Sequence, residues 1–455
     1  GNFILSPKSY ARVKGANDRV NVAVVGFSDR FRSSLLPGFT DHREELNFDM
    51  IGVSDIWSLR RDEGVQVVGE KIGHKVKGYR NNEEMYKDKD IDAVIISTPD
   101  FAHATHTVEA AEHGKHIYVE KPFAETMEDN RRARAAVEKA GVIFQVGSQR
   151  RSAPNYHAAN DYIRSGQFGD IVMCEMTWNV NQPGRWRRPS LVPKCREEDL
   201  DWIRFLCNRP FEAFDPRKYL EYRLFWPYSS GIPGQWMAHQ IDTVHWFTGL
   251  KHPRSVTANG GIYLGMGLVT MALTWLVAAV TLLSGGIYLW HDGRTNFDTM
   301  TAVMDYGPAD DPQKGFLVQY TSRFTNSAGS VKEIYYSNGG ELNLDTNKIT
   351  PNGGLTEGEA KAMGMHANQL APLDLKSTMK VATAGVTGVD PMTSVHVRNW
   401  MECIRSGEKT NAPVEAAYDH SSACIMVNAA LRTKQYVTFD EEHQEVLAGG
   451  KVFKF

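Results

Sequence analysis

The sequence predicts an α/β protein whose N-terminal part is a doubly wound parallel sheet. Two observations predict this fold: short apolar runs, each the length of one buried strand, and intervening stretches whose apolar residues recur at helical spacing. Their regular alternation from about residue 20 to residue 150 is typical of parallel strands joined by helical crossovers. The expected strands are residues 22–25, 48–53, 91–96, 117–119 and 142–146.

The length and composition limit the class of protein. A chain of 455 residues exceeds one ordinary domain of ~100–200 residues, so we expect two or three domains. The formal net charge of −3 predicts no nucleic-acid partner, because phosphate binding needs a concentrated basic face. The five cysteines are nowhere spaced like metal ligands, so we expect neither a disulfide framework nor a metal site. We place a polar arm at residues 1–19, the parallel-sheet domain at 20–150 and a second domain at 151–455.

The turn after the first strand is the first candidate for ligand binding. A glycine-rich turn that opens a helix lets backbone amides approach a pyrophosphate. Residues 26–31 read G-F-S-D-R-F, so only the first glycine of the expected G-x-G-x-x-G is present. Ser28 is small enough for close approach, and Arg30 adds a positive charge. We therefore predict that Gly26, Phe27, Ser28 and Arg30 bind a dinucleotide.

Asp55 closes the second expected strand. A carboxylate there can accept hydrogen bonds from a ribose diol and repel a 2′-phosphate, which favours NAD over NADP. It lies 29 residues after Gly26, beyond the usual ~20, and the loop at residues 37–45 can absorb the difference. The alternative for Asp55 is a helix N-cap.

The next strand ends lead to two further groups of candidates. Ser97, Thr98 and Pro99 would pass under the cofactor, with His103 on the helix that follows; His103 alone could also be a helix-surface or capping histidine. Residues 117–119 then deliver Glu120, Lys121 and Pro122 to the sheet edge where ligands bind in open α/β sheets. Proline fixes φ and would hold Lys121 in place, and a partly desolvated lysine can exchange a proton with a substrate hydroxyl. The alternative is a solvated Glu-Lys pair at the surface.

These motifs together resemble the glucose–fructose oxidoreductase, inositol dehydrogenase and rhizopine-catabolism family, Gfo/Idh/MocA. The resemblance covers nearly all of residues 20–455, and its most specific mark is Glu120-Lys121-Pro122. It implies an N-terminal Rossmann domain and a C-terminal α+β domain whose large, mostly antiparallel sheet supports the substrate site and often an oligomer interface. It also implies that Lys121 is catalytic, that a cis-proline follows it, and that Gln149 belongs to the cofactor-binding set.

The family's second catalytic element, an aspartate and a histidine four residues apart, maps to residues 235–239. His239 falls on the histidine, and Asp242 is an acidic residue three positions later, but Gln235 replaces the aspartate. A neutral amide can hydrogen-bond a sugar but cannot accept a proton at neutral pH. The resemblance therefore implies catalysis by Lys121 and His239, with Asp242 fixing the ring on one helix face. The alternative is that His239 and Asp242 only satisfy each other's polar groups within a hydrophobic core and have no catalytic role.

The second domain contains candidate sugar-binding residues. An expected strand at residues 171–180 carries Trp178 and Asn179, and the next fifty or so residues are rich in Trp, Arg, Tyr and Pro. Aromatic faces with guanidinium and amide donors suit a sugar ring, and they also suit a subunit interface. The expected substrate residues are Trp178, Asn179, Arg187, Tyr228, Gln235 and His239.

The remainder of the second domain continues the sheet and ends in helices. Further expected strands are 300–304, 316–320 and 331–336; residues 347–390 are expected as a long loop, and 393–404 and 414–431 as helices.

An uncharged stretch, residues 265–284, interrupts this domain. Its twenty residues match the length of one membrane span. The motif at 260–264 recurs at 285–289, so residues 265–289 resemble an insertion bounded by a direct repeat. A true span would separate the strands on either side, so we expect a buried or intersubunit helix, with an interfacial or hairpin membrane anchor as the alternative.

The leading functional hypothesis is an NAD-dependent oxidoreductase that acts on a secondary hydroxyl of a sugar or polyol. The alternative is a redox-neutral, NAD-dependent glycoside hydrolase that oxidises, eliminates, hydrates and reduces its substrate. A third possibility, a redox-silent sugar-binding relative, is disfavoured by the presence of Lys121 and Asp55. Residues 6–19 resemble the region after a twin-arginine signal in exported members of the family, which predicts a periplasmic location, with the cytoplasm as the alternative. We expect a homo-oligomer.

Overall fold

The computed structural model describes residues 18–182, 184–262, 292–308, 311, 313–375 and 390–454. Most of the expected arm and the whole insertion at 265–289, which includes the second copy of the repeat, therefore lie outside the described residues. The chain forms two compact units. The first is drawn from residues 1–157, 189–220 and 378–421, and the second from residues 158–188, 221–377 and 422–455.

The first unit is built on six parallel strands in the order β3-β2-β1-β4-β5-β6. The order reverses between β1 and β4, and ligands of such sheets bind at this reversal, outside the carboxyl ends of the strands. The expected doubly wound parallel sheet is confirmed. The strands are β1 (Val20–Val25), β2 (Phe48–Ser54), β3 (Lys77–Tyr79), β4 (Ala93–Ile96), β5 (His116–Val119) and β6 (Phe144–Val146).

Helices cover both faces of this sheet. Strand residues alternate between two hydrophobic cores: Val25 and Ile96 pack with α5 and α6, while Val24 and Ile95 pack with α2, α3 and α13. The helices of the first unit are a π-helical turn (Phe31–Leu35), α2 (Leu36–Leu46), α3 (Ser58–Ile72), α4 (Asn82–Tyr86), α5 (His103–Glu112), α6 (Met127–Ala140), α8 (Trp202–Leu206), α9 (Pro216–Leu220) and α13 (Pro391–Ser406). Two helices, α7 (Pro154–Arg164) and α14 (Val414–Thr433), continue into the second unit.

The second unit contains an eleven-stranded sheet in the order β14-β13-β12-β11-β7-β10-β9-β8-β15-β16-β17. All of its strand pairs are antiparallel except β7 with β10, which confirms the expected large, mostly antiparallel sheet. The strands are β7 (Ile171–Asn179), β8 (Ser255–Gly261), β9 (Thr299–Tyr306), β10 (Phe316–Arg323), β11 (Val331–Ser337), β12 (Gly340–Asn343), β13 (Lys348–Thr350), β14 (Leu373–Asp374), β15 (Val437–Asp440), β16 (Glu445–Ala448) and β17 (Lys451–Val452).

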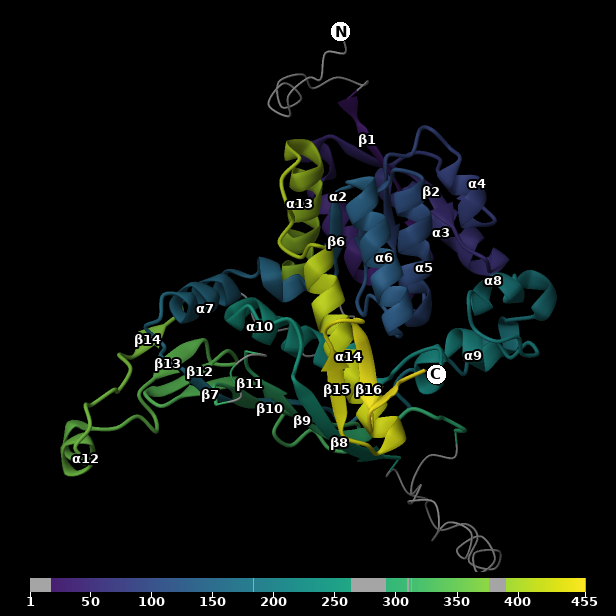
Figure 1. The fold of residues 1–455 in the computed structure, drawn as a ribbon. Helices are drawn as coiled ribbons and strands as arrows, with labels where there is room; N and C mark the ends of the chain where they lie inside the picture. The colour runs from purple at the N-terminus through teal and green to yellow at the C-terminus, as the bar shows by residue number, and fades with distance from the viewer. Residues whose placement is uncertain are drawn as a thin grey trace, which may run out of the picture. The chain divides into compact units, whose positions relative to one another are not determined.

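Helix α10 (Ala238–Thr248) lies on one face of this sheet, against β7 and β11 (Figure 1). Gln240 Nε2 donates to the carbonyl oxygen of Lys332 at 2.6 Å, and the Thr243 hydroxyl donates to the buried Glu333 carboxylate. These polar contacts fix the helix on the sheet. The helix therefore holds its side chains at defined positions.

The expectation of a loop over residues 347–390 is wrong for part of that range. β13 pairs with β12 through a turn in which Asn347 has φ of 57°, a conformation that asparagine tolerates. Helix α12 (Glu357–Ala362) begins with a capping box in which Thr356 and Glu359 satisfy each other's backbone N–H groups. The polar composition hid both elements, because neither has an apolar period. Residues 376–389 lie outside the described residues.

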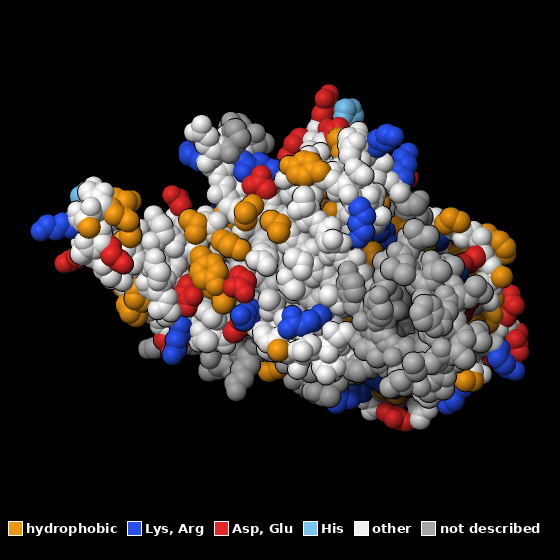
Figure 2. Space-filling view, turned by 90° about the horizontal axis from the view of Figure 1, so that it is seen from below, with side chains coloured by type: hydrophobic (Ala, Val, Ile, Leu, Met, Phe, Trp, Pro, Cys, Tyr) orange, Lys and Arg blue, Asp and Glu red, His pale blue; other side chains and the backbone are white. Residues whose placement is uncertain are grey.

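Within the part of the chain that the structure describes, no helix is both long and apolar enough to cross a membrane. Figure 2 shows the underside of the molecule, where apolar side chains are interspersed with acidic and basic ones. On strands β9 and β10, Val303 and Leu317 are exposed.

Candidate functional site

The turn after β1 is shaped by Gly26. Its φ is +85°, and a Cβ at this position would lie only 2.9 Å from Thr98 Cγ2 and 3.2 Å from the carbonyl oxygen of Ser97. Any other residue would therefore be strained and would push the β4 loop away. Ser28 opens the helix that follows, because its Oγ accepts the Phe31 N–H at 3.1 Å. The turn thus presents a helix start next to the end of β4.

Asp55 holds this turn from the end of β2. Its Oδ2 accepts the Phe27 N–H at 2.9 Å and its Oδ1 accepts the Trp57 N–H at 2.9 Å. Trp57, not Asp55, is the N-cap residue of α3. Burial raises the pKa of Asp55, and the two backbone hydrogen bonds oppose that rise. Oδ2 accepts only the Phe27 N–H among the described residues and keeps a lone pair, so the side chain can still accept from a ribose hydroxyl.

The loop after β4 contacts the glycine turn directly. The hydroxyls of Ser97 and Ser28 hydrogen-bond each other. Thr98 Oγ1 is buried and has no hydrogen-bond partner among the described residues. A buried hydroxyl without a partner costs free energy unless a ligand satisfies it. Thr98 therefore marks a position where a bound group is expected.

His103 is buried between two loops rather than exposed on its helix. Its Nδ1 lies 2.7 Å from the carbonyl oxygen of Pro122, and its Nε2 lies 2.9 Å from that of Thr98. Burial lowers the pKa of His103. The ring therefore ties the Thr98 loop to the Lys121–Pro122 loop, and the expectation of a surface histidine is not met.

Lys121 and Pro122 directly follow β5 at the same sheet edge. The Lys121–Pro122 peptide bond is cis, as the family resemblance implies. Lys121 is half-buried, whereas Pro122 is fully buried. The position is thus fixed by the end of a strand on one side and a buried proline on the other.

Glu120 is a buried anchor. Its Oε1 accepts from Arg30 Nε at 3.0 Å and from Gln149 Nε2 at 3.3 Å. Arg30 also donates to Thr393 Oγ1 at 3.0 Å. Burial lowers the pKa of Arg30, but Glu120, Tyr118 and Asp390 together raise it by more, so the net pKa is raised. The structure thus places Glu120, Arg30 and Gln149 in one network that joins the ends of β1, β5 and β6.

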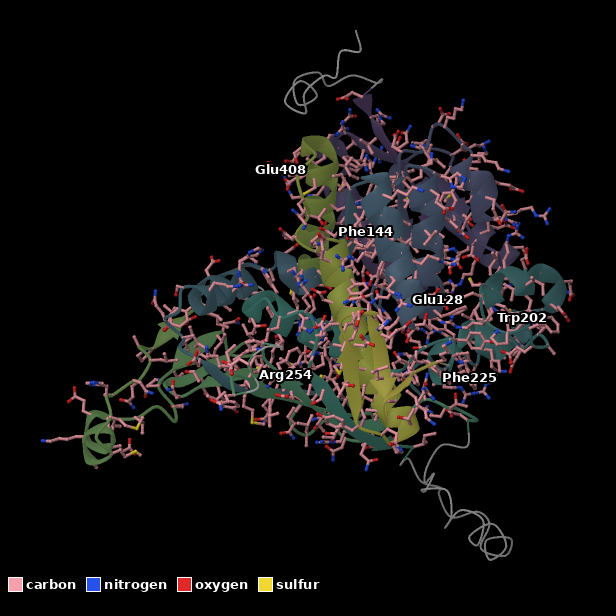
Figure 3. The ribbon with its side chains drawn as sticks, viewed as in Figure 1. Glu128, Phe144, Trp202, Phe225, Arg254 and Glu408 are labelled. Atoms are coloured by element: carbon pink, nitrogen blue, oxygen red, sulfur yellow. The ribbon has the colours of Figure 1, made fainter. Side chains whose placement is uncertain are left out.

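Residues 196–220, which we call the 196–220 segment, pack in the first unit beside Asp55. The Asp201 N–H donates to the carbonyl oxygen of Ile56 at 3.1 Å, and the Tyr219 hydroxyl lies 3.5 Å from Asp55 Oδ1. Trp202, labelled in Figure 3, stacks on Phe205 with ring centroids 4.9 Å apart. The sequence did not predict the packing of this segment beside Asp55, because the contacts of Asp201 and Tyr219 join residues more than 140 positions apart.

The first unit therefore fits a dinucleotide. A tight glycine turn opens a helix, a carboxylate closes β2, and the Thr98 hydroxyl lacks a partner. Arg60 was missed by sequence reasoning, and it pairs with Asp29 at 3.0 Å. Burial lowers its pKa, but the carboxylates of Asp29, Glu63 and Asp55 together raise it by more. No local motif singles out this arginine on α3.

In the second unit, His239 lies within an aromatic cluster. Trp178 stacks on His239 with centroids 5.9 Å apart, and on Trp236 at 5.8 Å with the rings nearly parallel. Trp186 and Phe324 complete the cluster against Trp236. The sequence expected Trp178 and His239 in one site, and the structure brings them together.

The remaining substrate candidates have different surroundings. Gln235 Oε1 accepts from Arg223 Nε at 2.8 Å, and Asp242 is fully buried on α10. Asn179 is buried, and its Nδ2 donates to the carbonyl oxygen of Ala328 at 3.3 Å. Arg187 pairs with the buried Glu221 at 2.9 Å. Tyr228 is only 2% exposed, so it can support a site but offers little surface to a ligand.

Metal binding finds no support in the described residues. Across those ranges no three His, Cys, Asp or Glu side chains are grouped to hold an ion. All five cysteines are free.

Comparison with known proteins finds a family match within the first unit. Residues 20–148 match the family described as "Oxidoreductase family, NAD-binding Rossmann fold". This part of the chain is therefore similar to the NAD-binding domain of Gfo/Idh/MocA oxidoreductases.

Curated relatives match parts of this chain, and solved structures share its fold. The chain is 33% identical over 147 residues to the 1,5-anhydro-D-fructose reductase of Ensifer adhaerens, covering 30% of this chain and 44% of that protein. It is 44% identical over 89 residues to the scyllo-inositol 2-dehydrogenase (NAD(+)) of Bacillus subtilis, covering 20% of this chain and 26% of that protein. The chain thus spans less than half the length of these two curated relatives. A levoglucosan dehydrogenase in complex with NADH and levoglucosan has the same fold, with a TM-score of 0.60, 15% identity and coverage of 92% of this chain and 99% of that one.

Proposed function

We propose that this protein is an NAD-dependent oxidoreductase that acts on a secondary hydroxyl of a sugar or polyol. One observation carries the proposal: the glycine turn, Asp55, the unpartnered Thr98 hydroxyl and Lys121 all lie at the carboxyl edge of one parallel sheet. The curated relatives, a reductase of an anhydrosugar and a dehydrogenase of an inositol, support the same substrate class.

The residues would divide the work as follows. Asp55 would accept the hydroxyls of the adenosine ribose, which favours NAD over NADP. The Lys121 side chain, as its neutral amine, would take the proton of the substrate hydroxyl and become an ammonium; His239 is the alternative base. The nicotinamide, when bound, supplies the hydride acceptor. His103 would keep the Lys121 loop in register with the Thr98 loop.

Purified full-length protein would test this proposal. We would first denature a sample and assay the released nucleotide. Native protein would then be incubated with NAD and a panel of inositols, aldoses and aryl glycosides. NADH formed in proportion to oxidised product is the expected result, and Lys121→Met should lower kcat by about 100-fold or more. Aglycone release without net NADH would instead establish the redox-neutral glycoside hydrolase.

Two further proposals concern the whole protein. We propose a homo-oligomer, and the exposed Val303 and Leu317 on neighbouring strands support an association surface. Light scattering of wild type and Leu317→Glu tests it, and a monomeric wild type would contradict it. The proposed periplasmic location rests on residues 6–19 alone, and cell fractionation tests it.

A further inference from the structure

Two arginines beside the His239 cluster have neutral partners. Arg185 lies over the Trp236 ring, 5.0 Å from its centroid, and its Nη1 donates to the Gln182 side chain. Arg223 donates to Gln235, one helical turn before His239. In the described part of the chain, neither Arg185 nor Arg223 forms an ion pair with an acidic side chain.

Neighbouring arginines in the same unit show the contrast. Arg187 pairs with Glu221 at 2.9 Å, and Arg294 pairs with Asp292 at 2.7 Å. These carboxylates are almost fully buried and are already neutralised. The balance of charge around Arg185 and Arg223 is therefore positive.

Arg185 itself is in an unfavourable environment. Its Nε is buried without a hydrogen-bond partner among the described residues. Burial, together with the charges of Arg223 and Arg188, lowers the pKa of Arg185 to about 10. A partly buried guanidinium with like charges around it is costly unless an anion joins it. The fold nevertheless holds it against the aromatic cluster.

The backbone next to Arg185 is strained. Trp186 has φ of 68°, a conformation that a bulky residue rarely adopts. Its ring packs edge-on against Phe324, with centroids 4.9 Å apart. Strain of this kind gathers at ligand-binding sites, where the surrounding structure fixes an unfavourable conformation. Here it accompanies two contacts with the same ring: the Arg185 guanidinium lies over Trp236, and the Trp186 ring centroid lies 6.0 Å from that of Trp236.

We propose that Arg185 and Arg223 bind an oxyanion group, a carboxylate or a phosphate, carried by the sugar substrate. Guanidinium groups recognise both groups through charge-assisted, often bidentate hydrogen bonds. The aromatic rings of Trp178 and Trp236 suit the sugar ring next to the anion. This inference rests on the proposed function for the identity of the substrate as a sugar, and it narrows that substrate to an acidic one.

Calorimetric titration of the wild-type protein tests the inference without turnover. The probes are matched in their ring: D-glucose, D-glucuronate and D-glucose 6-phosphate. At least one anionic probe should bind about 10-fold to 100-fold more tightly than D-glucose, the range expected for a hydrogen-bonded charge pair. The anionic probe that binds more tightly, D-glucuronate or D-glucose 6-phosphate, shows whether the site prefers a carboxylate or a phosphate. Equal affinities for all three probes, or no binding by any, would overturn the inference.

Variants locate the effect. Arg185→Gln and Arg223→Gln should each lower the affinity for the anionic probe more than the affinity for D-glucose, and so remove the preference for the anion. Arg185→Lys keeps the positive charge but loses the planar pair of N–H donors that can bind an oxyanion bidentately. This variant should therefore retain part of the preference for the anionic probe. Arg254→Gln is the matched control: Arg254, labelled in Figure 3, pairs with Asp305 at 2.8 Å on β9 and is remote in sequence from the cluster. Melting temperatures show which variants fold.

The two proposals fail separately. If anionic probes bind as expected but no probe or polyol yields NADH, the oxyanion site stands and the oxidoreductase proposal fails. If neutral polyols yield NADH and Arg185→Gln changes neither kcat nor KM for them or for the acids, the oxidoreductase proposal stands and the oxyanion site is overturned.

Discussion

At the scale of single residues, we expect the Asp55 carboxylate to determine whether the protein binds NAD or NADP. Asp55→Asn keeps the shape but removes the charge that favours a ribose diol and repels a 2′-phosphate. We expect NAD affinity to fall about 10-fold to 100-fold and NADP to bind better relative to NAD, because Arg60 lies nearby. Isothermal titration with both nucleotides measures this. Asp62→Asn, on the exposed side of α3, is the control and should change neither affinity.

The same residue predicts a pH dependence. Burial raises the pKa of Asp55, and the binding-competent form is the carboxylate. As the pH falls through this raised pKa, the carboxylate is protonated, so NAD affinity should begin to drop at a higher pH than an ordinary aspartate would allow. Asp55→Asn should bind weakly with a flat profile. An unchanged wild-type affinity through the acidic range would contradict the assignment.

His103 should act as a positioning residue. His103→Asn removes at least one of the two contacts through which His103 holds the Thr98 and Pro122 loops together. Lys121 would then be displaced from its position. Because small displacements of a catalytic group are costly, we expect kcat to fall about 10-fold to 100-fold with a smaller change in the KM for NAD. Steady-state kinetics measure the split. His113→Asn, on the exposed end of α5, should leave both constants unchanged; equal losses in both variants would point to general destabilisation instead.

The sequence predicted those residues of the candidate site whose positions depend only on the adjacent strand. Gly26, Asp55 and Lys121 each follow an apolar strand, so their place at the sheet edge could be read from position alone. The side chains that hydrogen-bond to the candidate site residues could not be predicted from position in the sequence. Tyr219 beside Asp55 and Arg223 on Gln235 come from short helices whose placement depends on tertiary packing.

At the scale of elements, strands were predictable where burial is complete. β1, β4 and β5 are continuous apolar runs, and each was expected within about three residues of its observed bounds. β3 was missed, because Lys77–Tyr79 is a short edge strand with two exposed residues. Elements held by hydrogen bonds at the surface carry little hydrophobic signal.

The 196–220 segment allows a test at this scale. Arg209 is buried and lies 3.5 Å from the buried Asp129 carboxylate at the start of α6. Arg209→Gln leaves that charge uncompensated, so we expect about 3–5 kcal/mol of lost stability. Arg204→Gln in the same segment breaks an exposed pair with Glu83 and should cost below about 1 kcal/mol. Urea unfolding compares the two variants. Equal losses would show that the burial of Arg209 does not anchor the segment.

At the scale of the whole molecule, the chain forms two compact units whose segments are interleaved in sequence. The 196–220 segment and α13 belong with the parallel sheet, although α13 begins only at Pro391 and β6 ends at Val146. A cooperative unit should respond as one to a ligand that binds it. NAD binding to the first unit should therefore be felt in distant stretches of sequence.

Hydrogen exchange with and without saturating NAD measures this response. We expect slower exchange in β1 and β2, in the 196–220 segment beside Asp55 and in α13, whose Thr393 contacts Arg30. The central strands of the second sheet, such as Val331–Ser337, should exchange at the same rate in both samples, because they belong to the other unit. If the 196–220 segment keeps its exchange rate while β1 and β2 are protected, its packing against Asp55 is independent of the nucleotide. In that case the Tyr219 contact would serve stability alone, and the cofactor site would end at the sheet edge.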